Sequence, residues 1–383
     1  MQSIPQARRR TLRTWSHSQE PNELQEEGTS GKAISLIDLA SNDYLGLSRH
    51  QELIEAARMV MNRDGVGAGA SRQVTGSRPI HKELEEAIAD WLGKDSVLLF
   101  PSGFQANLAA VIALADRHTT VLADRLIHHS LLIGVKASGA QLKRFAHNDL
   151  NDLERHLKLC RNNQSNQTPL VITESLFSME GTSPAIKRMA KLCEKYGAQF
   201  LVDEAHSLGV MGPHGRGLCY GLSEPITILS GTFGKAFGSG GAFLASNKQV
   251  REELLQTSGA FRYSTALAPP LTAAALASLK LIQENPHWGE KLQRVAVHWR
   301  SQLSTKGWGR PPGNGPILPL MIGTDEKALF YQQQLERSGL LCLAIRPPTV
   351  PEGTSRMRLA LHKDLPNGTL ERLINALTHQ RDK

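Results

Sequence analysis

One lysine of this sequence is predicted to lie in a loop that leaves its amine accessible. Lys235 stands between two glycines in Thr232-Phe-Gly-Lys-Ala-Phe-Gly238, shortly after the apolar run at residues 226–229. An accessible amine of this kind can attack a carbonyl group and form a Schiff base. It could also bind a phosphate group, although the Lys-Ser/Thr pair of a P-loop is absent, or it could be an exposed structural lysine. The loop alone leaves these three interpretations open.

An aspartate and a histidine follow another apolar run. Asp203 and His206 come directly after Phe200-Leu-Val202. A carboxylate here could keep the ring nitrogen of pyridoxal 5′-phosphate (PLP) protonated, so that the ring acts as an electron sink. A histidine three residues later could reach the phenolic oxygen of the same cofactor. The alternatives are a helix-capping aspartate with a structural histidine, or a loosely spaced metal site with His128 or His129.

Two further segments could hold the phosphate and the ring of such a cofactor. Ser102-Gly-Phe-Gln-Ala-Asn107 opens a predicted helix that runs to Ala115, and free N–H groups at the start of a helix bind phosphate. The same residues could equally be an ordinary N-cap. His128, in Asp124-Arg-Leu-Ile-His-His-Ser130, could stack on a flat ring or could simply begin a helix.

Each of these segments follows a short apolar run that we predict to be a strand. Segments of helical length and period separate the runs, and this alternation predicts an α/β protein with a mostly parallel sheet covered on both faces. Ligands bind outside the carboxyl ends of the strands in such a sheet. The predicted strands are residues 97–100, 120–122, 170–173, 200–202, 226–229 and 242–245.

The alternation ends near Pro286 and divides the chain into three predicted parts. Residues 1–45 form an N-terminal segment that is polar and predicted to be irregular up to residue 40. Residues 46–285 form a large domain, and residues 286–383 form a smaller α+β domain. Helices are predicted at residues 51–63, 81–91 and 288–304.

The composition limits the classes of function. The chain has 383 residues, of which 40% are hydrophobic, as in ordinary globular proteins. No apolar run reaches the roughly 18 residues that a membrane-spanning helix needs, and the N-terminus has no apolar stretch of signal-peptide type. The four cysteines are far apart and form no Cys-x-x-Cys pair, which predicts neither a zinc site nor a disulfide framework. We therefore expect a cytoplasmic protein with no membrane contact and no metal.

The net charge of +8 is compatible with an anionic partner. The densest basic cluster consists of Arg8, Arg9, Arg10 and Arg13. We interpret it as a solvated segment or a contact with a small molecule, because aromatic residues that could stack on bases make up only 5% of the chain. Nucleic acid is not an expected partner.

Taken together, these stretches resemble the α-oxoamine synthases, and the resemblance covers nearly the whole chain. It implies PLP as the cofactor and the PLP-dependent transferase fold of type I, with a seven-stranded, mostly parallel sheet in the large domain. It also implies a homodimer with the active site at the subunit interface. The matching stretches are Ser41–Leu47, Thr173–Gly181, Val202–His206 and Thr232–Gly238.

The resemblance implies a role for the residues around the cofactor ring. Lys235 would carry PLP as a Schiff base and would then remove the α-proton of the amino acid. Asp203 would pair with the ring nitrogen, and His206 would bond the phenolic oxygen. His128 would stack on the ring face and so lie next to the substrate, and Ser178 would support the ring substituents.

The phosphate site is implied in the same way. Thr232 and the backbone of Gly103 and Phe104 would hold the phosphate group. Asn42, as a substrate contact, and the stretch Tyr263-Ser-Thr265 would reach the site, either from the same subunit or from a second one.

The stretch Ala344-Ile-Arg-Pro-Pro-Thr-Val-Pro351, followed by Arg356-Met-Arg358, narrows the resemblance. It points to members that join L-alanine to a pimeloyl thioester in biotin biosynthesis, with release of CO₂ and the free thiol. Arg346 would contact the carboxylate of the amino acid and Thr349 the acyl substrate. Arg10, chosen among the N-terminal arginines, would also contact the acyl substrate. The donor could be pimeloyl-CoA or pimeloyl-acyl carrier protein.

Two alternative functions are compatible with the same motifs. The chain could be glycine C-acetyltransferase or another α-oxoamine synthase. It could also be a catalytically inactive PLP-binding regulatory module, although the joint presence of Lys235, Asp203 and His206 favours an enzyme.

Overall fold

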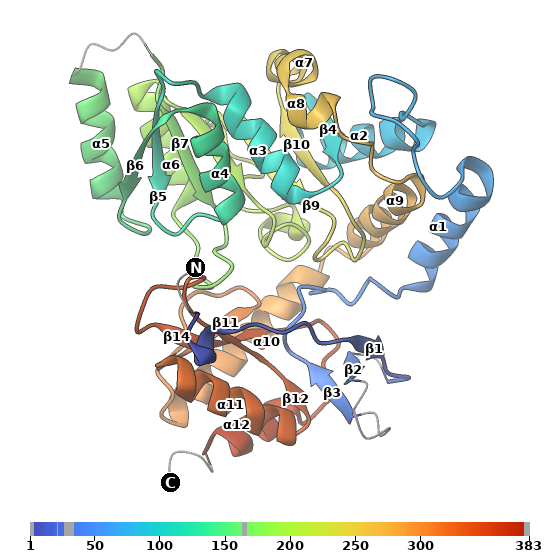
Figure 1. Cartoon of the computed structure of the whole chain (residues 1–383), viewed down its shortest axis with the longest axis vertical. Coiled ribbons are helices and arrows are strands. Elements are labelled where there is room, and N and C mark those ends of the chain that lie inside the picture. The colour runs from blue at the N-terminus through green and yellow to red at the C-terminus, as the bar shows by residue number, and fades with distance from the viewer. Residues whose placement is uncertain (1–3, 21, 27–33, 163–166, 379–383) are drawn as a thin grey trace. The chain divides into compact units, whose positions relative to one another are not determined.

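The computed structural model describes residues 4–20, 22–26, 34–162 and 167–378 (Figure 1). Its contacts divide the chain into two compact units. Unit 1 comprises Met1–Gly46, Ser178–Thr182 and Lys291–Lys383, and unit 2 comprises Leu47–Phe177 and Ser183–Glu290. The N-terminal residues therefore cluster with the C-terminal ones. In the structure, unit 2 ends at Glu290 and the last segment of unit 1 begins at Lys291. The sequence predicts this domain boundary between residues 285 and 286.

Unit 2 contains a seven-stranded sheet in the order β4-β10-β9-β8-β7-β5-β6. β10 is antiparallel to both of its neighbours, and the other pairs are parallel. This confirms the predicted α/β class and the mostly parallel sheet. The strands are β4 (Ser96–Phe100), β5 (Thr120–Asp124), β6 (Gln141–Phe145), β7 (Leu170–Glu174), β8 (Gln199–Asp203), β9 (Ile228–Thr232) and β10 (Ala242–Ser246).

Two details of the strand prediction are wrong. β6 was not predicted, because it is an edge strand in which only Phe145 is fully buried and the apolar pattern is weak. β9 begins at Ile228 and ends at Thr232, so the predicted run at residues 226–229 starts too early. The correction places Thr232 at the carboxyl end of the strand.

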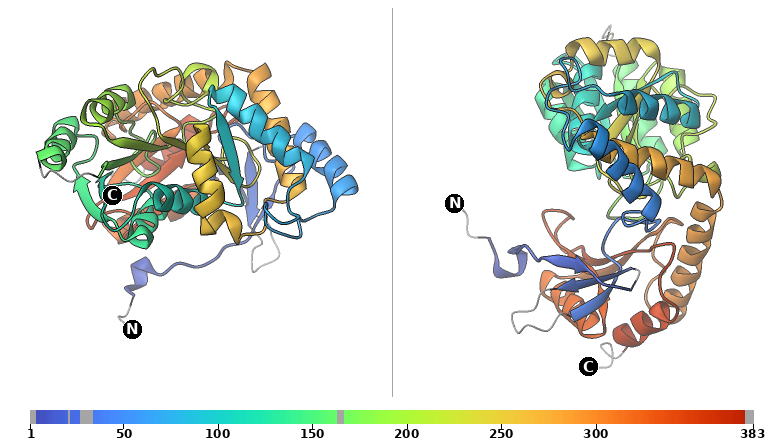
Figure 2. Two further views of the ribbon diagram at one scale, coloured as in Figure 1. Left: turned by 90° about the horizontal axis from the view of Figure 1, so that it is seen from above. Right: turned by 90° about the vertical axis from the view of Figure 1, so that its right-hand side faces the viewer.

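Helices cover both faces of this sheet (Figure 1 and Figure 2). The start of α3 meets the candidate site described below. Ser102 is its N-cap and accepts a hydrogen bond from the backbone N–H of Gln105, and alanine-rich turns then pack into the core beneath the sheet. The helices are α1 (Gln51–Asp64), α2 (Pro79–Leu92), α3 (Gly103–Leu114), α4 (His129–Ser138), α5 (Leu150–Asn162), α6 (Ile186–Tyr196), α7 (Lys248–Thr257), α8 (Gly259–Arg262) and α9 (Pro269–Glu284), with a short 3-10 turn η2 (Pro213–Gly215).

Unit 1 contains two smaller sheets with the orders β1-β2-β3-β12 and β11-β14-β13. The prediction of an irregular N-terminus is wrong, since β3 pairs in parallel with β12 from the far end of the chain and β2 pairs with β3. β1 also pairs with β2, so two local pairings and one long-range pairing form this sheet. The elements are η1 (Gln6–Arg8), β1 (Trp15–His17), β2 (Glu23–Glu26), β3 (Ile34–Asp38), α10 (Trp288–Thr305), β11 (Ile317–Gly323), α11 (Asp325–Arg337), β12 (Leu340–Leu341), β13 (Leu343–Ile345), β14 (Ser355–Ala360) and α12 (Thr369–Thr378). Among the described helices, none combines the length and the apolar character needed to cross a membrane.

A fully buried cation stabilises unit 1. The guanidinium of Arg300 in α10 donates hydrogen bonds to the backbone carbonyls of Ala296, Pro312, Gly315 and Ile317, at 2.8–3.2 Å. Burial lowers its pKa to about 10. One side chain therefore satisfies the backbone of the segment that leads into β11.

We expect Arg300→Met to lower the free energy of unfolding by about 2–4 kcal/mol, because buried carbonyls would lose their donors. Thermal and urea denaturation measure this change. Arg294→Met, at an exposed position of the same helix, is the matched control. A loss within about 0.5 kcal/mol of the control would show that the carbonyls find other partners.

Candidate active site

Unit 2 contains a cavity of about 220 Å³ at the carboxyl ends of β7, β8 and β9 and at the start of α3. This is the position that the strand-end rule predicts. Most residues predicted for the cofactor site line it, and Asn107, Glu174 and Ser230 join them. The lining residues are Gly103, Phe104, Asn107, His128, Glu174, Asp203, Ala205, His206, Ser230, Gly231, Thr232 and Lys235.

Lys235 lies on a tight loop after β9. The buried rings of Phe233 and Phe237 anchor the loop on both sides of the lysine. Gly238 has a φ of 60°, and a Cβ there would lie 2.4 Å from the backbone nitrogen of Ser48, so only glycine fits. The Nζ of Lys235 lies 2.9 Å from Nε2 of His206. The amine is thus held at the cavity next to an imidazole.

Asp203 ends β8 and is only 6% exposed. Its Oδ1 accepts a hydrogen bond from the backbone N–H of Ala205 at 2.9 Å, and its Oδ2 accepts from Nδ2 of Asn107 at 2.7 Å. The bond to Ala205 closes a turn and is not the helix cap considered as an alternative, because the described residues that directly follow Asp203 form turns and no helix; the side chain also lines the cavity. A buried carboxylate with oriented donors can hold a proton on a ring nitrogen.

His128 is the N-cap of α4. Its Nδ1 accepts a hydrogen bond from the backbone N–H of Ser130 and lies 2.7 Å from Ser130 Oγ. Burial lowers the pKa of His128; Asp203 opposes this shift, whereas Lys235 and His129 add to it. Burial therefore favours the neutral form of the imidazole, as suits a group that stacks on a flat ring.

The start of α3 faces Thr232. A Cβ at Gly103 would lie 3.9 Å from Thr232 Oγ1, and that hydroxyl donates to the carbonyl of Gly241 and accepts from the N–H of Gly234. Backbone N–H groups and the helix dipole at this point favour an anion.

The donor set fits PLP. The amine of Lys235 suits its aldehyde, the start of α3 with Thr232 suits its phosphate, and the carboxylate of Asp203 suits its ring nitrogen. Over the described ranges, no three His, Cys, Asp or Glu side chains converge as metal ligands would. The residues thus match an aldehyde cofactor with a phosphate group.

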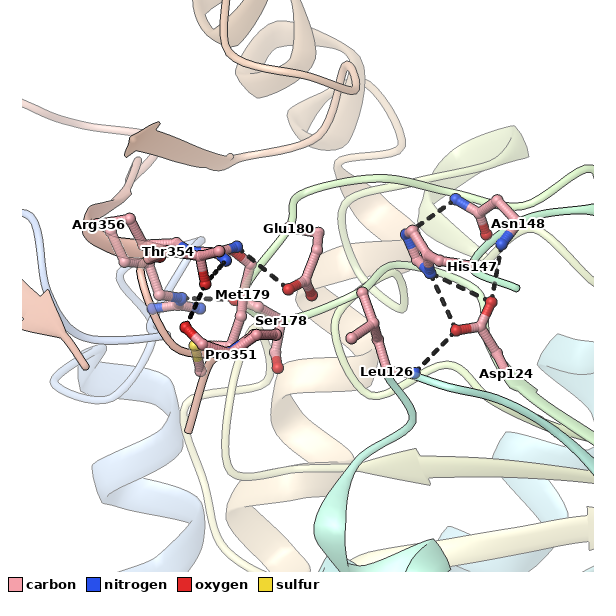
Figure 3. Close-up of polar contacts among 11 residues, drawn as sticks. Asp124, Leu126, His147, Asn148, Ser178, Met179, Glu180, Pro351, Thr354 and Arg356 are labelled. Atoms are coloured by element: carbon pink, nitrogen blue, oxygen red, sulfur yellow. Dashed lines mark hydrogen bonds and ion pairs between the residues drawn. The ribbon is translucent and has the colours of Figure 1, made fainter. Parts of the chain in front are cut away.

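A buried carboxylate holds the turn that leads to His128. Asp124 ends β5 and accepts hydrogen bonds from the backbone N–H groups of Leu126 and Asn148 and from Nδ1 of His147, at 2.9–3.0 Å (Figure 3). In the sequence, Asp124 begins the segment that was considered as a possible contact of the cofactor ring. Its hydrogen bonds instead give it a structural role, because they join the turn after β5 to the turn after β6.

Unit 1 brings three predicted substrate residues together. Arg10 Nη2 donates to Thr349 Oγ1 at 2.8 Å, and Arg346 Nη1 donates to the carbonyl of Ala7. Burial lowers the pKa of Arg346, and the charge of Arg10 lowers it further. The Nε of Arg346 is buried and has no hydrogen-bond partner among the described residues. Arg8, by contrast, is paired with Asp325 and Glu352.

Arg358 was not assigned a role from the sequence. It is buried in β14, and it donates to the carbonyl of Ser178 at 2.7 Å and to Asn42 Oδ1 at 2.8 Å. Arg356, on the same strand, pairs instead with Glu180 (Figure 3). Ser178 thus belongs to unit 1 and does not line the cavity of unit 2.

Asn107 and Ser130 were also missed. The sequence signal was available for Asn107, since it is a polar residue in the otherwise apolar middle of α3 and is 3% exposed. A buried donor needs an acceptor, and Asp203 and Ser130 both accept from Nδ2 of Asn107.

Comparison with known proteins supports the cofactor that this site fits. Residues 34–377 match the family model of class I and II aminotransferases. The chain is 40% identical to the 8-amino-7-oxononanoate synthase of Methylococcus capsulatus over 344 residues, 89% of this chain and 88% of the relative. It is 39% identical to that of Methylobacillus flagellatus over 344 residues, 89% of this chain and 86% of the relative.

Solved structures show the same fold. Serine palmitoyltransferase from S. paucimobilis, solved with a bound PLP–myriocin aldimine, has a TM-score of 0.89 and 27% identity, over 96% of this chain and 92% of that one. The 8-amino-7-oxononanoate synthase of Francisella tularensis has a TM-score of 0.77 and 26% identity, over 91% and 98%. PLP is therefore the cofactor, and the chain belongs to the 8-amino-7-oxononanoate synthase family of PLP-dependent acyltransferases.

Proposed function

We propose that this enzyme condenses L-alanine with a pimeloyl thioester and releases 8-amino-7-oxononanoate, CO₂ and the free thiol. The observation that carries the proposal is the identity of 39–40% over 89% of the chain to synthases of that name. The cavity in unit 2 and the arginines in unit 1 supply the chemical groups that the reaction needs.

When bound, PLP supplies an electron sink for a carbanion at the α-carbon of the amino acid. Lys235 anchors the cofactor and then accepts the α-proton of alanine at Nζ. Asp203 holds a proton at the ring nitrogen. His206, 2.9 Å from Nζ, orients the amine and bonds the phenolic oxygen. His128 covers one face of the ring and excludes water from it.

The two substrates bring two terminal groups that suit arginine. Alanine has a carboxylate, and the pimeloyl chain ends in a carboxylate or its ester. In unit 1, Arg346 and Arg358 are suited to bind these carboxylates. Their hydrogen-bond partners are neutral groups, so these bonds do not neutralise the positive charge of either guanidinium. The planar fork of arginine binds a carboxylate with two hydrogen bonds.

The contacts of unit 1 lead us to revise one assignment. Arg346 lies close to Arg10, which bonds Thr349, so we place all three on the acyl substrate. Arg358, which Asn42 orients, is then the partner for the carboxylate of alanine. The sequence had placed Arg346 on alanine.

Variants of the two arginines test this division. We expect Arg346→Ala to raise KM for pimeloyl-CoA about 10- to 100-fold and Arg358→Ala to raise KM for alanine by a similar factor, because each removes a charged contact of roughly 1.5–3 kcal/mol. PLP binding should change little. Arg9→Ala, at an exposed position of the basic cluster, is the control. If both variants raised KM for both substrates equally, the assignment of Arg346 to the acyl substrate and Arg358 to alanine would be refuted.

We propose in addition a homodimer in the cytoplasm. Tyr263 and Val74 are 81% and 74% exposed, and they flank two segments that pair through Ser71 and Thr265. Large exposed side chains on two bridged segments support an interface between subunits at this place. The four cysteines are free, as they are in a reducing compartment.

The choice of substrates tests the function against its alternative. We expect kcat/KM for L-alanine with pimeloyl-CoA to exceed that for glycine with acetyl-CoA by about two orders of magnitude or more. Release of free thiol reports both reactions. Equal or faster turnover of glycine with acetyl-CoA would move the chain to the glycine C-acetyltransferase alternative and leave the PLP site unchanged.

A further inference from the structure

Four side chains of unit 2 form a continuous chain of hydrogen bonds at the cavity. Asn107 Nδ2 lies 2.7 Å from Asp203 Oδ2 and 2.9 Å from Ser130 Oγ. Ser130 Oγ in turn lies 2.7 Å from His128 Nδ1. Asn107 and Ser130 are 3% and 0% exposed, so bulk water does not compete for these bonds. The carboxylate of Asp203 is thereby connected to the imidazole of His128.

The direction of every bond follows from the two ends of this chain. The backbone N–H of Ser130 can only donate, and it lies 3.3 Å from His128 Nδ1, so that nitrogen accepts and bears no proton. Ser130 Oγ must then donate its only proton to the same nitrogen and accept from Asn107. At the other end, the carboxylate of Asp203 only accepts, which requires the amide nitrogen of Asn107 to face it.

These directions leave the imidazole proton of His128 on Nε2, and they leave only the amide oxygen of Asn107 without a partner among the described residues. The neutral form is the relevant one, because burial lowers the pKa of His128 and the charges of Lys235 and His129 lower it further, against the opposing charge of Asp203. Without the Ser130 hydroxyl, only the longer contact with the backbone N–H of Ser130, at 3.3 Å, would favour this tautomer, so the proton would lie on Nδ1 more often.

We propose that Asn107 and Ser130 are positioning residues. They fix His128 as its Nε2–H tautomer, and Asn107 also fixes the orientation of the Asp203 carboxylate. Two contacts of the cofactor ring, at its face and at its nitrogen, are then set by one buried network. The proposal rests on the assignment of the PLP site and is independent of which amino acid and acyl donor react.

The tautomer of His128 can be measured by ¹⁵N NMR on protein labelled at histidine, with and without PLP, at about pH 9, where the imidazole is neutral. His128→Gln identifies the resonances. We expect the Nε2–H form in the wild-type protein. Ser130→Ala should raise the fraction of the Nδ1–H form about three- to tenfold, the effect of losing one neutral hydrogen bond. Ser130→Thr, which keeps the hydroxyl, should restore the wild-type ratio.

Ser278→Ala is the matched control, because Ser278 is also a fully buried serine of unit 2 and its Oγ has no hydrogen-bond partner among the described residues. It should leave the tautomer unchanged. If Ser130→Ala does not fold, Ser130→Cys retains a weaker donor and should give an intermediate ratio. Asn107→Leu should weaken PLP binding about three- to tenfold, since Asp203 loses its donor. A wild-type tautomer ratio in folded Ser130→Ala or Ser130→Cys would overturn the proposal, even if activity falls.

Discussion

Replacing Lys235 with alanine should abolish the absorption band of lysine-bound PLP and lower kcat by about 10⁴-fold. The amine both anchors the cofactor and accepts the α-proton, and a positioned acid or base alone contributes roughly 10²- to 10⁴-fold. Visible absorption of the purified protein and the rate of thiol release measure the two effects. The fold should survive, because the buried rings of Phe233 and Phe237 hold the loop independently of Lys235.

Lys280→Ala is the control for the loss of a lysine from unit 2, since Lys280 is an exposed residue of α9. It should retain the band and the activity. Circular dichroism should show that both variants are folded. Near-normal turnover by Lys235→Ala would mean that another amine bears the cofactor.

The second large effect is expected at the carboxylate that faces the ring nitrogen. Asp203→Asn should retain PLP but should exchange the α-proton of alanine about 10²- to 10³-fold more slowly, because an amide cannot hold the ring proton by charge. Exchange in D₂O without an acyl donor isolates this step and can be followed by NMR.

Asp149→Asn makes the same change of charge on the surface of unit 2. Asparagine can also accept the two backbone N–H groups that Asp149 caps, so this control should behave as wild type. Undiminished exchange in Asp203→Asn would remove Asp203 from the mechanism.

The cavity could be predicted from the sequence because its residues follow buried apolar runs. Asp203 and Thr232 end β8 and β9, and His128 follows β5. In a parallel sheet the carboxyl ends of the strands meet at one edge, so position in the sequence determines position in space. The resemblance of the motifs then gave each of these residues a role.

The network that joins these residues could not be predicted. Asn107 meets Ser130 and Asp203 across 23 and 96 residues of sequence, and no local pattern encodes such contacts. The prediction for the N-terminal segment was wrong partly for the same reason, because one of the two partners of β3 is β12, about 300 residues away. Arg358 is a third case, since its role depends on the positions of Asn42 and Ser178 in unit 1.

The central claim is the condensation of L-alanine with a pimeloyl thioester, and one reaction mixture tests it directly. The purified protein is incubated with PLP, pimeloyl-CoA and L-alanine labelled with ¹³C at its carboxyl carbon, and all products are measured by mass spectrometry. We predict labelled CO₂, free CoA and unlabelled 8-amino-7-oxononanoate in equal amounts, because the carboxyl carbon of alanine is the one that leaves. Label retained in the amino product, or the absence of that product beside active turnover of glycine and acetyl-CoA, would contradict the account.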